Sequence, residues 1–317
     1  MEQNNIDIFA QKVRASKNIA IMAHKNPDGD ALCSVLAMAR LIELNYGVRC
    51  LCVYDGNIPE NFDDLPLRRW MHYHAKVEEP KHFDLSILLD YGTVRNIGGT
   101  MNIINNSDFV VEIDHHLNDA PIANLCLDDD TAAATGVLIY QIIQKLGWAY
   151  DDEVMKLLAV AILTDTGNFR FVRNGVALRI MADLVERGVS IRQLQDVMND
   201  KPRRAVQAEA ACVANAQFFH HGRLALATIP HEEYKKLDGR GEIALALLRQ
   251  IKGVEYVVLL KEQRENQIGV SFRGRTCPVD AIAASFGGGG HMYASGAVVA
   301  DTLENVHARV VEKLKGL

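Results

Sequence analysis

The sequence lacks the long apolar runs that membrane proteins need. No run reaches the roughly 18 to 20 apolar residues that span a bilayer. The first residues, Met1 to Asn5, lack the basic and apolar regions of a signal peptide. We therefore expect a cytoplasmic protein without a membrane partner. Internal repeats, low-complexity tracts and heptads are also missing, which excludes a repeat architecture and a coiled coil.

Cysteine and positive charge are scarce as well. The six cysteines are dispersed, and the closest pair, Cys50 and Cys52, has C-x-C spacing in an apolar run. This pattern favours buried, reduced thiols over a disulfide framework or a zinc ribbon. The formal net charge of -6 argues against tight, sequence-blind binding of long nucleic acid. A short anionic substrate held by a few local cations remains compatible with this charge.

The length and the pattern of the chain predict two α/β domains. The 317 residues, 49% of them hydrophobic and 23% charged, are typical of a soluble globular protein with two cores. Residues 1–188 alternate strand-like and helix-like stretches, which indicates βαβ units and a mainly parallel sheet. Residues 189–219 are helical and more polar, as in a linker or hinge. Residues 220–317 predict a smaller α/β domain.

The expected elements follow from apolar periodicity. In the first domain we expect strands at 18–23, 48–53, 85–89 and 109–113, and helices at 30–44, 135–146, 152–162 and 176–187. In the second domain we expect strands at 224–229, 254–261, 267–272 and 296–299, and helices at 278–286 and 303–314.

Metal-ligand side chains follow four apolar, strand-like runs. His24, Asp28 and Asp30 follow residues 19–23, Asp90 follows 87–89, and Asp114, His115 and His116 follow 109–113. Asp165 follows 161–164, which we read as a fourth strand end. The carboxyl ends of parallel strands converge on one crevice. We therefore predict that these residues form a single site.

The residue types in this set indicate a pair of divalent cations. Two imidazoles and four carboxylates suit Mn²⁺, Fe²⁺ or Zn²⁺, and the carboxylate share favours a harder ion such as Mn²⁺ or Mg²⁺. Two ions about 3.5 to 4 Å apart would use all six ligands and would suit in-line attack on phosphorus. A single Asp at a strand end is usually a helix cap or a turn former, but four such ends together favour a dimetal site. The six predicted ligands are His24, Asp28, Asp30, Asp90, His115 and Asp165.

These motifs resemble the DHH phosphoesterases. The resemblance covers nearly the whole chain and is strongest in four motifs: His24-x-x-Pro27-Asp28-Gly29-Asp30, Asp90, Asp114-His115-His116 and Thr164-Asp165-Thr166-Gly167. A fifth motif, Gly287 to His291, is similar to the DHH-associated domain of the short two-domain branch. That branch includes nano-RNA hydrolases that also dephosphorylate 3′-phosphoadenosine-5′-phosphate (pAp).

The resemblance implies a role for each residue. His24 and Asp28 would bind one ion, Asp30, His115 and Asp165 the other, and Asp90 would bridge them. Asp114 would orient an imidazole, as carboxylates do beside metal sites. His116 would help to protonate the leaving oxygen, with Asn118 nearby.

The second domain would hold the phosphates of the substrate. Consecutive glycines allow a backbone to approach an anion and to form a nest of N–H groups. The resemblance implies that Gly288, Gly289, Gly290, His291 and Arg273 bind phosphate, with the active site in the cleft between the two domains. It also implies a homodimer formed through the larger lobe.

We therefore expect an Mn²⁺-dependent phosphoesterase that hydrolyses short RNA oligonucleotides to mononucleotides and pAp to AMP. A phosphodiesterase for cyclic dinucleotides or pApA uses the same chemistry, and the sequence leaves that alternative open. A catalytically inactive nucleotide or RNA binder is the alternative from another class. All six predicted ligands are present, which disfavours the inactive binder.

Overall fold

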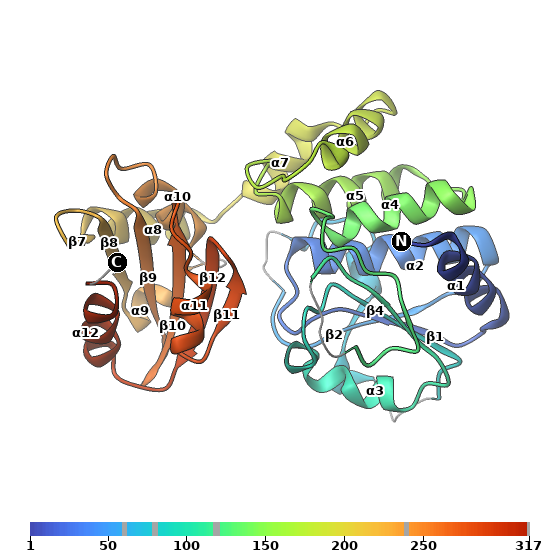
Figure 1. Ribbon diagram of the computed structural model, residues 1–317, viewed down its shortest axis with the longest axis horizontal. Helices are drawn as coiled ribbons and strands as arrows, with labels where there is room; N and C mark the ends of the chain where they lie inside the picture. Colours follow the sequence, from blue (N-terminus) through green and yellow to red (C-terminus); the bar gives the residue numbers. More distant parts are fainter. Residues whose placement is uncertain (59–61, 78–81, 117–120, 238–240, 316–317) are drawn as a thin grey trace. The chain divides into compact units, whose positions relative to one another are not determined.

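The chain folds into two compact units. The computed structural model describes residues 1–58, 62–77, 82–116, 121–237 and 241–315, and its units are Met1–Asn199 and Asp200–Leu317 (Figure 1). The division falls inside the range 189–219 where we expect a hinge. Among the described residues, no helix has both the length and the apolar character needed to cross a membrane.

The first unit is built on a six-stranded sheet in the order β3-β2-β1-β4-β5-β6, in which every neighbouring pair is parallel. The central strands β1, β4 and β5 are buried along their whole length, as expected for a parallel sheet covered on both faces. Its strands are β1 (Ile19–Met22), β2 (Leu51–Tyr54), β3 (Met71–Tyr73), β4 (Leu85–Leu89), β5 (Val110–Ile113) and β6 (Leu125–Cys126).

Helices cover both faces of this sheet. In Figure 1, α2 (Gly29–Tyr46), α4 (Thr135–Leu146) and α5 (Asp152–Asp165) lie on one face, and α3 (Met101–Asn105) lies on the other. The main core includes residues of α2, α4 and α5 together with alternate residues of the strands, and the intervening strand residues form a second core. The unit also contains α1 (Gln3–Ala15), η2 (Arg68–Trp70), η3 (His74–Lys76), η4 (Val94–Asn96), η5 (Gly98–Thr100), α6 (Val176–Glu186) and α7 (Ile191–Asn199).

One sequence expectation about this unit is wrong. The apolar run at 161–164 is the last turn of α5 and not a strand, so Asp165 lies at the C-terminal end of a helix. Residues Leu157 to Leu163 are all buried within a layer of helices, and this removes the polar face that would reveal a helical period. The predicted ligands therefore follow three strand ends, and the fourth position is the end of a helix.

The second unit is built on a mixed sheet in the order β11-β12-β10-β9-β8-β7. Only β8 and β9 are parallel; the other neighbours are antiparallel. Its elements are α8 (Arg203–Ala214), β7 (Gln217–Phe219), β8 (Leu224–Ile229), α9 (His231–Tyr234), α10 (Glu242–Leu248), β9 (Tyr256–Arg264), β10 (Gln267–Gly274), α11 (Asp280–Ser285), β11 (Gly289–His291), β12 (Ala294–Val299) and α12 (Leu303–Lys313).

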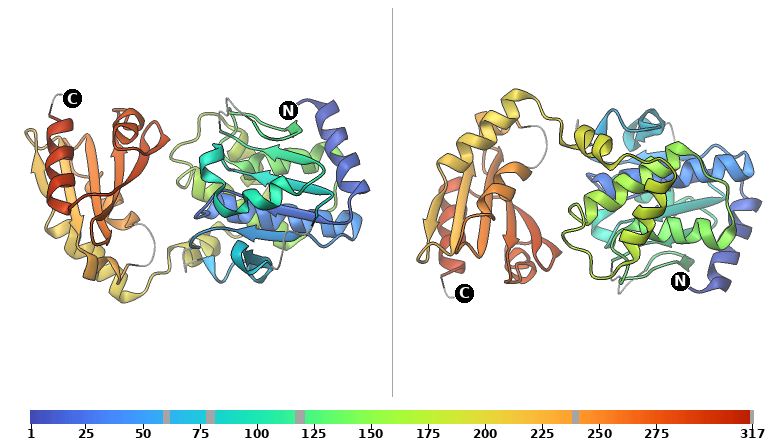
Figure 2. Two further views of the ribbon diagram at one scale, coloured as in Figure 1. Left: turned by 90° about the horizontal axis from the view of Figure 1, so that it is seen from below. Right: turned by 90° about the horizontal axis from the view of Figure 1, so that it is seen from above.

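The two faces of this second sheet have separate cores. Residues of α11 and α12 pack on one face, and α12 can be followed along the sheet in Figure 2. On the other face, α8 and α10 form a smaller core with β8 and β9. The strand pairing aligns Arg273 with Ala294, and Ala294 with His291, so these three residues form one row across β10, β12 and β11.

Candidate metal centre

The predicted ligands of the first unit gather at one edge of the parallel sheet. His24 follows β1, Asp90 follows β4, and Asp114 and His115 follow β5. Asp28 is the N-cap of α2, where its carboxylate accepts a hydrogen bond from the N–H of Ala31 at 3.2 Å. Asp30 lies in the first turn of the same helix, and Asp165 ends α5. Sequence-distant residues are thus brought to the carboxyl ends of the strands, as expected for a parallel sheet.

Two groups of potential ligands in this cluster correspond to the predicted sets, and a third group, Asp90, Asp114, His115 and His116, overlaps both. In the first group, His24, Asp28 and Asp90 each offer one atom within 4.8 Å of the other two. In the second group, Asp30, His115 and Asp165 meet the same limit. These are the two sets of ligands that the sequence motifs imply.

Asp90 lies between the two groups. Its Oδ2 is 3.9 Å from Nε2 of His24, and its Oδ1 is 3.4 Å from Nε2 of His115. The residue is 3% exposed and its φ is 49°, a left-handed conformation that is uncommon for a residue other than glycine. Its buried Oδ1 accepts no hydrogen bond from the described part of the chain. A carboxylate held in this way has one oxygen directed to each group.

Asp30 is held by the beginning of another helix. Its Oδ2 accepts a hydrogen bond from the N–H of Thr135 at 2.6 Å, and its Oδ1 accepts hydrogen bonds from the N–H of Gly136 at 3.0 Å and from the hydroxyl of Ser34 at 2.9 Å. The N–H groups in the first turn of a helix have no partner in their own helix and favour a negative charge. Of these partners only Ser34 has a signal in the sequence, because it is four residues from Asp30, the helical spacing for contact.

Two glycines allow these helices to approach one another closely. A Cβ atom on Gly29 would lie 2.4 Å from Cγ2 of Thr164, next to Asp165. A Cβ atom on Gly136 would lie 2.7 Å from Cβ of Ala161. Larger residues at these positions would separate the ends of α2, α4 and α5. The glycines therefore help to place Asp30 and Asp165 in the same group.

Asp114 orients His116. Its Oδ1 accepts hydrogen bonds from Nδ1 of His116 at 2.7 Å and from the backbone N–H of His116 at 2.9 Å. Its Oδ2 accepts hydrogen bonds from the N–H groups of Tyr91 and Gly92, both at 2.8 Å. Burial alone would raise the pKa of Asp114, but these donors outweigh burial and lower it. The carboxylate thus stays ionised and holds the proton of His116 on Nδ1.

The excess of acids raises the pKa of the histidines. Burial opposes a charged imidazole at His24, but the hydrogen bond and charge of Asp28, together with Asp90, raise its pKa to about 9. At His115 burial is again outweighed, by Asp90, Asp165 and Asp30, and its pKa rises to about 10. The pKa of His116 is also raised, because the hydrogen bond to Asp114 and the charge of Asp90 outweigh burial.

The same crowding raises the pKa of the acids. Burial, followed by the charges of Asp90 and Asp165, raises the pKa of Asp30 well above its usual range. Burial and the charges of Asp90 and Asp28 raise the pKa of Asp165 to about 7, although His115 opposes this shift. Protons therefore compensate a surplus of negative charge when no cation is bound. Carboxylate oxygens and imidazole nitrogens at this density, with a buried oxygen of Asp90 left without a donor, fit divalent cations.

The second unit contains the predicted phosphate-binding residues. Arg273 on β10 shares a cross-strand row with Ala294 and with the backbone position of His291. The glycine run is partly an edge strand, because Gly289 and Gly290 pair with β12. The N–H groups of Gly287 and Gly288 donate to carbonyl oxygens of α11, so they close that helix and are not available as nest donors. Asn118, also predicted near the substrate, lies outside the described residues.

Comparisons with known proteins agree with this architecture. Residues 18–163 match the model of the DHH family, N-terminal domain, and residues 224–316 match the DHHA1 domain. The chain combines a DHH domain with a DHHA1 domain. The DHH match contains the first ligand group and both histidines of the triplet, whereas Asp165 lies two positions beyond its last residue.

Two relatives align with nearly the whole chain, through both the DHH and the DHHA1 domain. The chain is 29% identical over 300 residues to the "bifunctional oligoribonuclease and PAP phosphatase NrnA" of Thermus thermophilus, covering 94% of this chain and 89% of the relative. It is 23% identical to the "probable bifunctional oligoribonuclease and PAP phosphatase NrnA" of Streptococcus mutans, covering 96% of each. The crystal structure of an exopolyphosphatase-related protein from Bacteroides fragilis shares the fold, with a TM-score of 0.90 at 22% identity over 99% of this chain and 97% of the other.

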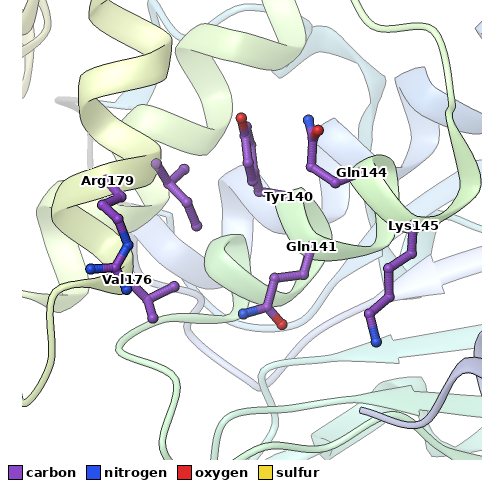
Figure 3. Close-up of a pocket in the computed structure, with 7 residues that line it drawn as sticks. Tyr140, Gln141, Gln144, Lys145, Val176 and Arg179 are labelled. Carbon is purple, nitrogen blue, oxygen red and sulfur yellow. The ribbon is translucent and has the colours of Figure 1, made fainter.

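A separate groove of the DHH domain lies between α4 and α6. Figure 3 shows residues that line this groove: Tyr140, Gln141, Gln144 and Lys145 from α4, and Val176 and Arg179 from α6. Its lining contains no acid and no histidine. It therefore cannot provide the ligands that the predicted chemistry needs, and the site stays with the acidic cluster.

Proposed function

We propose that the protein is a metal-dependent phosphodiesterase that hydrolyses short oligoribonucleotides to mononucleotides and pAp to AMP. The observation that carries this proposal is the position of Asp90, with one carboxylate oxygen near each of two His/Asp groups, in a chain with DHH and DHHA1 domains. Relatives named as oligoribonucleases and PAP phosphatases support the choice of substrates.

His24, Asp28 and Asp90 would hold one divalent cation, and Asp30, His115, Asp165 and Asp90 the other. The carboxylate-rich donor set favours Mn²⁺. When bound, the two cations would polarise the phosphate and supply an acidified water as nucleophile. The chain itself fixes the ligands: the N–H groups of α4 and the hydroxyl of Ser34 hold Asp30, and the backbone turn after β4 holds Asp90.

His116 would supply the proton for the leaving oxygen. Its raised pKa favours the protonated imidazole, and Asp114 keeps one proton on Nδ1, so Nε2 carries the proton that can be transferred. This division of roles needs His116 to remain outside both ligand groups. His116 also lies close to Asp90, Asp114 and His115, but the groups that contain His24 and Asp30 do not include it.

Residues 220–317 would bind the phosphates of the substrate. Arg273 lies in the row that also contains the backbone position of His291, and its Nη1 donates to the carbonyl oxygen of Phe272 at 3.1 Å. A guanidinium matches phosphate geometry. Gly289 and Gly290 leave the edge of the sheet without side chains beside this row. We further propose that Gly288 acts through the shape of the backbone rather than through its N–H group, that Asn118 contributes from the DHH domain, and that 1–188 and 220–317 act as catalytic and substrate-binding domains.

A substrate panel tests this proposal. The full chain with Mn²⁺ is incubated with pAp, pApA, RNA of two to five nucleotides, a long RNA and cyclic di-AMP, and products are separated by chromatography. We expect mononucleotides from the shortest RNA and phosphate from pAp. Preferred turnover of cyclic di-AMP would replace the proposed substrate class, and no turnover of any substrate would favour a nucleotide-binding protein.

The matched variants are Asp90→Ala and Asp108→Ala. Asp108 belongs to the same unit and forms an exposed pair with His82 at 3.0 Å. It is a member of neither ligand group and lies with His82 and Asp84 in a separate surface set. The proposal requires that Asp90→Ala loses activity and that Asp108→Ala keeps it. Equal activities in the two variants would contradict the role of Asp90.

A further inference from the structure

The turn that carries Asp90 is attached both to β5 and to Asp114, which follows β5. The N–H of Asp90 donates to the carbonyl oxygen of Ile113 at 3.2 Å. The N–H groups of Tyr91 and Gly92 both donate to Oδ2 of Asp114, at 2.8 Å. The phenol of Tyr91 donates to Oε2 of Glu112 at 2.7 Å. Glu112 and Asp114 are two residues apart, which places both side chains on the same face of the strand. Residues of β5 thus hold the end of β4 through backbone and side-chain bonds together.

Tyr91, which follows Asp90 directly in the chain, and Glu112 are both buried. Tyr91 is 1% exposed and packs in the core on the α3 face of the sheet, and Glu112 is fully buried. Glu112 is also 3.8 Å from the thiol of Cys126. Neither Tyr91 nor Glu112 belongs to the two ligand groups of His24 and His115; the carboxylate of Glu112 lies instead near Cys126 and Asp128. A buried carboxylate within an apolar strand needs a specific reason to be there, because its charge is costly to desolvate.

The backbone of Asp90 supplies that reason. Its φ of 49° is unfavourable for a residue with a Cβ atom, so the conformation persists only where neighbouring contacts impose it. The residue after Asp90 is Tyr91, whose ring is fixed at its far end by Glu112 and whose N–H is fixed by Asp114. With both ends of Tyr91 held, Asp90 has little freedom to return to an extended conformation.

We propose that the hydrogen bond from Tyr91 to Glu112 is a positioning contact that holds Asp90 between the two ligand groups for cation binding. The inference rests on the proposed metal site and extends it to two residues that touch neither cation nor substrate. Contacts of this kind, one layer behind the ligands, change metal affinity by roughly 10- to 100-fold when removed.

Three variants test the contact. Tyr91→Phe removes only the hydroxyl. Glu112→Gln keeps an acceptor oxygen for that hydroxyl while removing the charge. Tyr140→Phe is the matched control, because its phenol also donates to a carboxylate, Asp183 at 2.6 Å. Tyr140 lines the separate groove between α4 and α6 and belongs to neither ligand group (Figure 3). Mn²⁺ binding to each full-length, EDTA-treated protein is measured by isothermal titration calorimetry, with circular dichroism and thermal melting as folding checks.

We expect Mn²⁺ affinity to fall about tenfold in Tyr91→Phe and to stay near the wild-type value in Glu112→Gln and Tyr140→Phe. Activity at saturating Mn²⁺ should largely recover in Tyr91→Phe, because the ligands themselves remain. Wild-type Mn²⁺ affinity in Tyr91→Phe, or an equal loss in Tyr140→Phe, would overturn the positioning role. If Tyr91→Phe does not fold, Glu112→Leu removes the acceptor of the same hydrogen bond, and wild-type Mn²⁺ affinity in that folded variant would overturn the positioning role. Absence of Mn²⁺ binding by the wild-type protein would instead refute the metal site itself.

Discussion

Replacing Asp165 by asparagine should stabilise the metal-free protein while weakening metal binding. Burial and neighbouring carboxylates raise the pKa of Asp165 from 3.8 to about 7. Between these two values the folded state binds a proton that the unfolded state has lost, so stability falls as the pH rises through this window. Each pH unit of the window contributes about 1.4 kcal/mol, so the charged carboxylate costs the fold up to about 4 kcal/mol above pH 7.

The asparagine removes this cost but also loses the contact with His115, which lies 3.5 Å from Oδ2 of Asp165. We therefore expect a net gain of about 1–3 kcal/mol at pH 8 in EDTA, which is a rise in Tm of about 3 to 10 °C for a unit of this size. The gain in stability of Asp165→Asn should be clearly smaller at pH 5, because the carboxyl group of Asp165 is still protonated in the folded wild type at that pH. Excess Mn²⁺ should reverse the order of stability, because the wild type keeps the complete ligand set.

Differential scanning calorimetry at pH 5 and pH 8, with EDTA and with Mn²⁺, measures these changes. Asp183→Asn is a suitable control, because hydrogen bonds from Arg187 and Tyr140 lower the pKa of Asp183. Its loss should lower Tm by a similar amount at both pH values, since both lie above the window in which this acid titrates. The reasoning is refuted if Asp165→Asn is less stable than the wild type in EDTA at pH 8, or if its gain does not depend on pH.

Three further outcomes follow from the described contacts. Asp90→Ala should lower kcat at least 100-fold and leave the circular dichroism spectrum unchanged, because two ligand groups lose their shared carboxylate; steady-state kinetics with pAp would show this, and near-normal kcat would contradict it. Arg273→Ala should raise KM about tenfold or more with a smaller change in kcat, as expected for lost phosphate binding. Gly136→Ala should destabilise the DHH domain by about 1–3 kcal/mol, because the new Cβ would lie 2.7 Å from Cβ of Ala161. Urea denaturation measures this change, and an unchanged midpoint would contradict the prediction.

Most of the large elements were predictable because their signals are local. The ends of β4, β8 and α4 coincide with the predicted ranges 85–89, 224–229 and 135–146. Strands β3 and β6 were missed, since pieces of three and two residues carry almost no period of their own. Helix α1 was also missed, although Ile6, Phe9 and Val13 form a buried stripe at helical spacing.

The candidate site was less predictable than the fold. The sequence identified every member of the two ligand groups, because acids and imidazoles immediately after apolar runs are unusual. The prediction that Asp165 follows a strand was wrong, because Asp165 ends helix α5. The prediction that the whole glycine run forms an anion nest was also wrong, because the N–H groups of Gly287 and Gly288 donate to carbonyl oxygens of α11. The sequence also predicted no role for Glu112, whose only signal was an acid within an apolar strand.

The sequence by itself determined which residues could bind metal and that they follow the ends of apolar elements, because ligand chemistry and apolar runs are properties of short segments. Only the tertiary structure decided that Asp90 lies between two groups, that the start of α4 holds Asp30, and that Tyr91 reaches Glu112. These contacts join residues that are distant in the chain or lie on different strands. They depend on strand order and helix packing, which arise from the burial of all the apolar faces together.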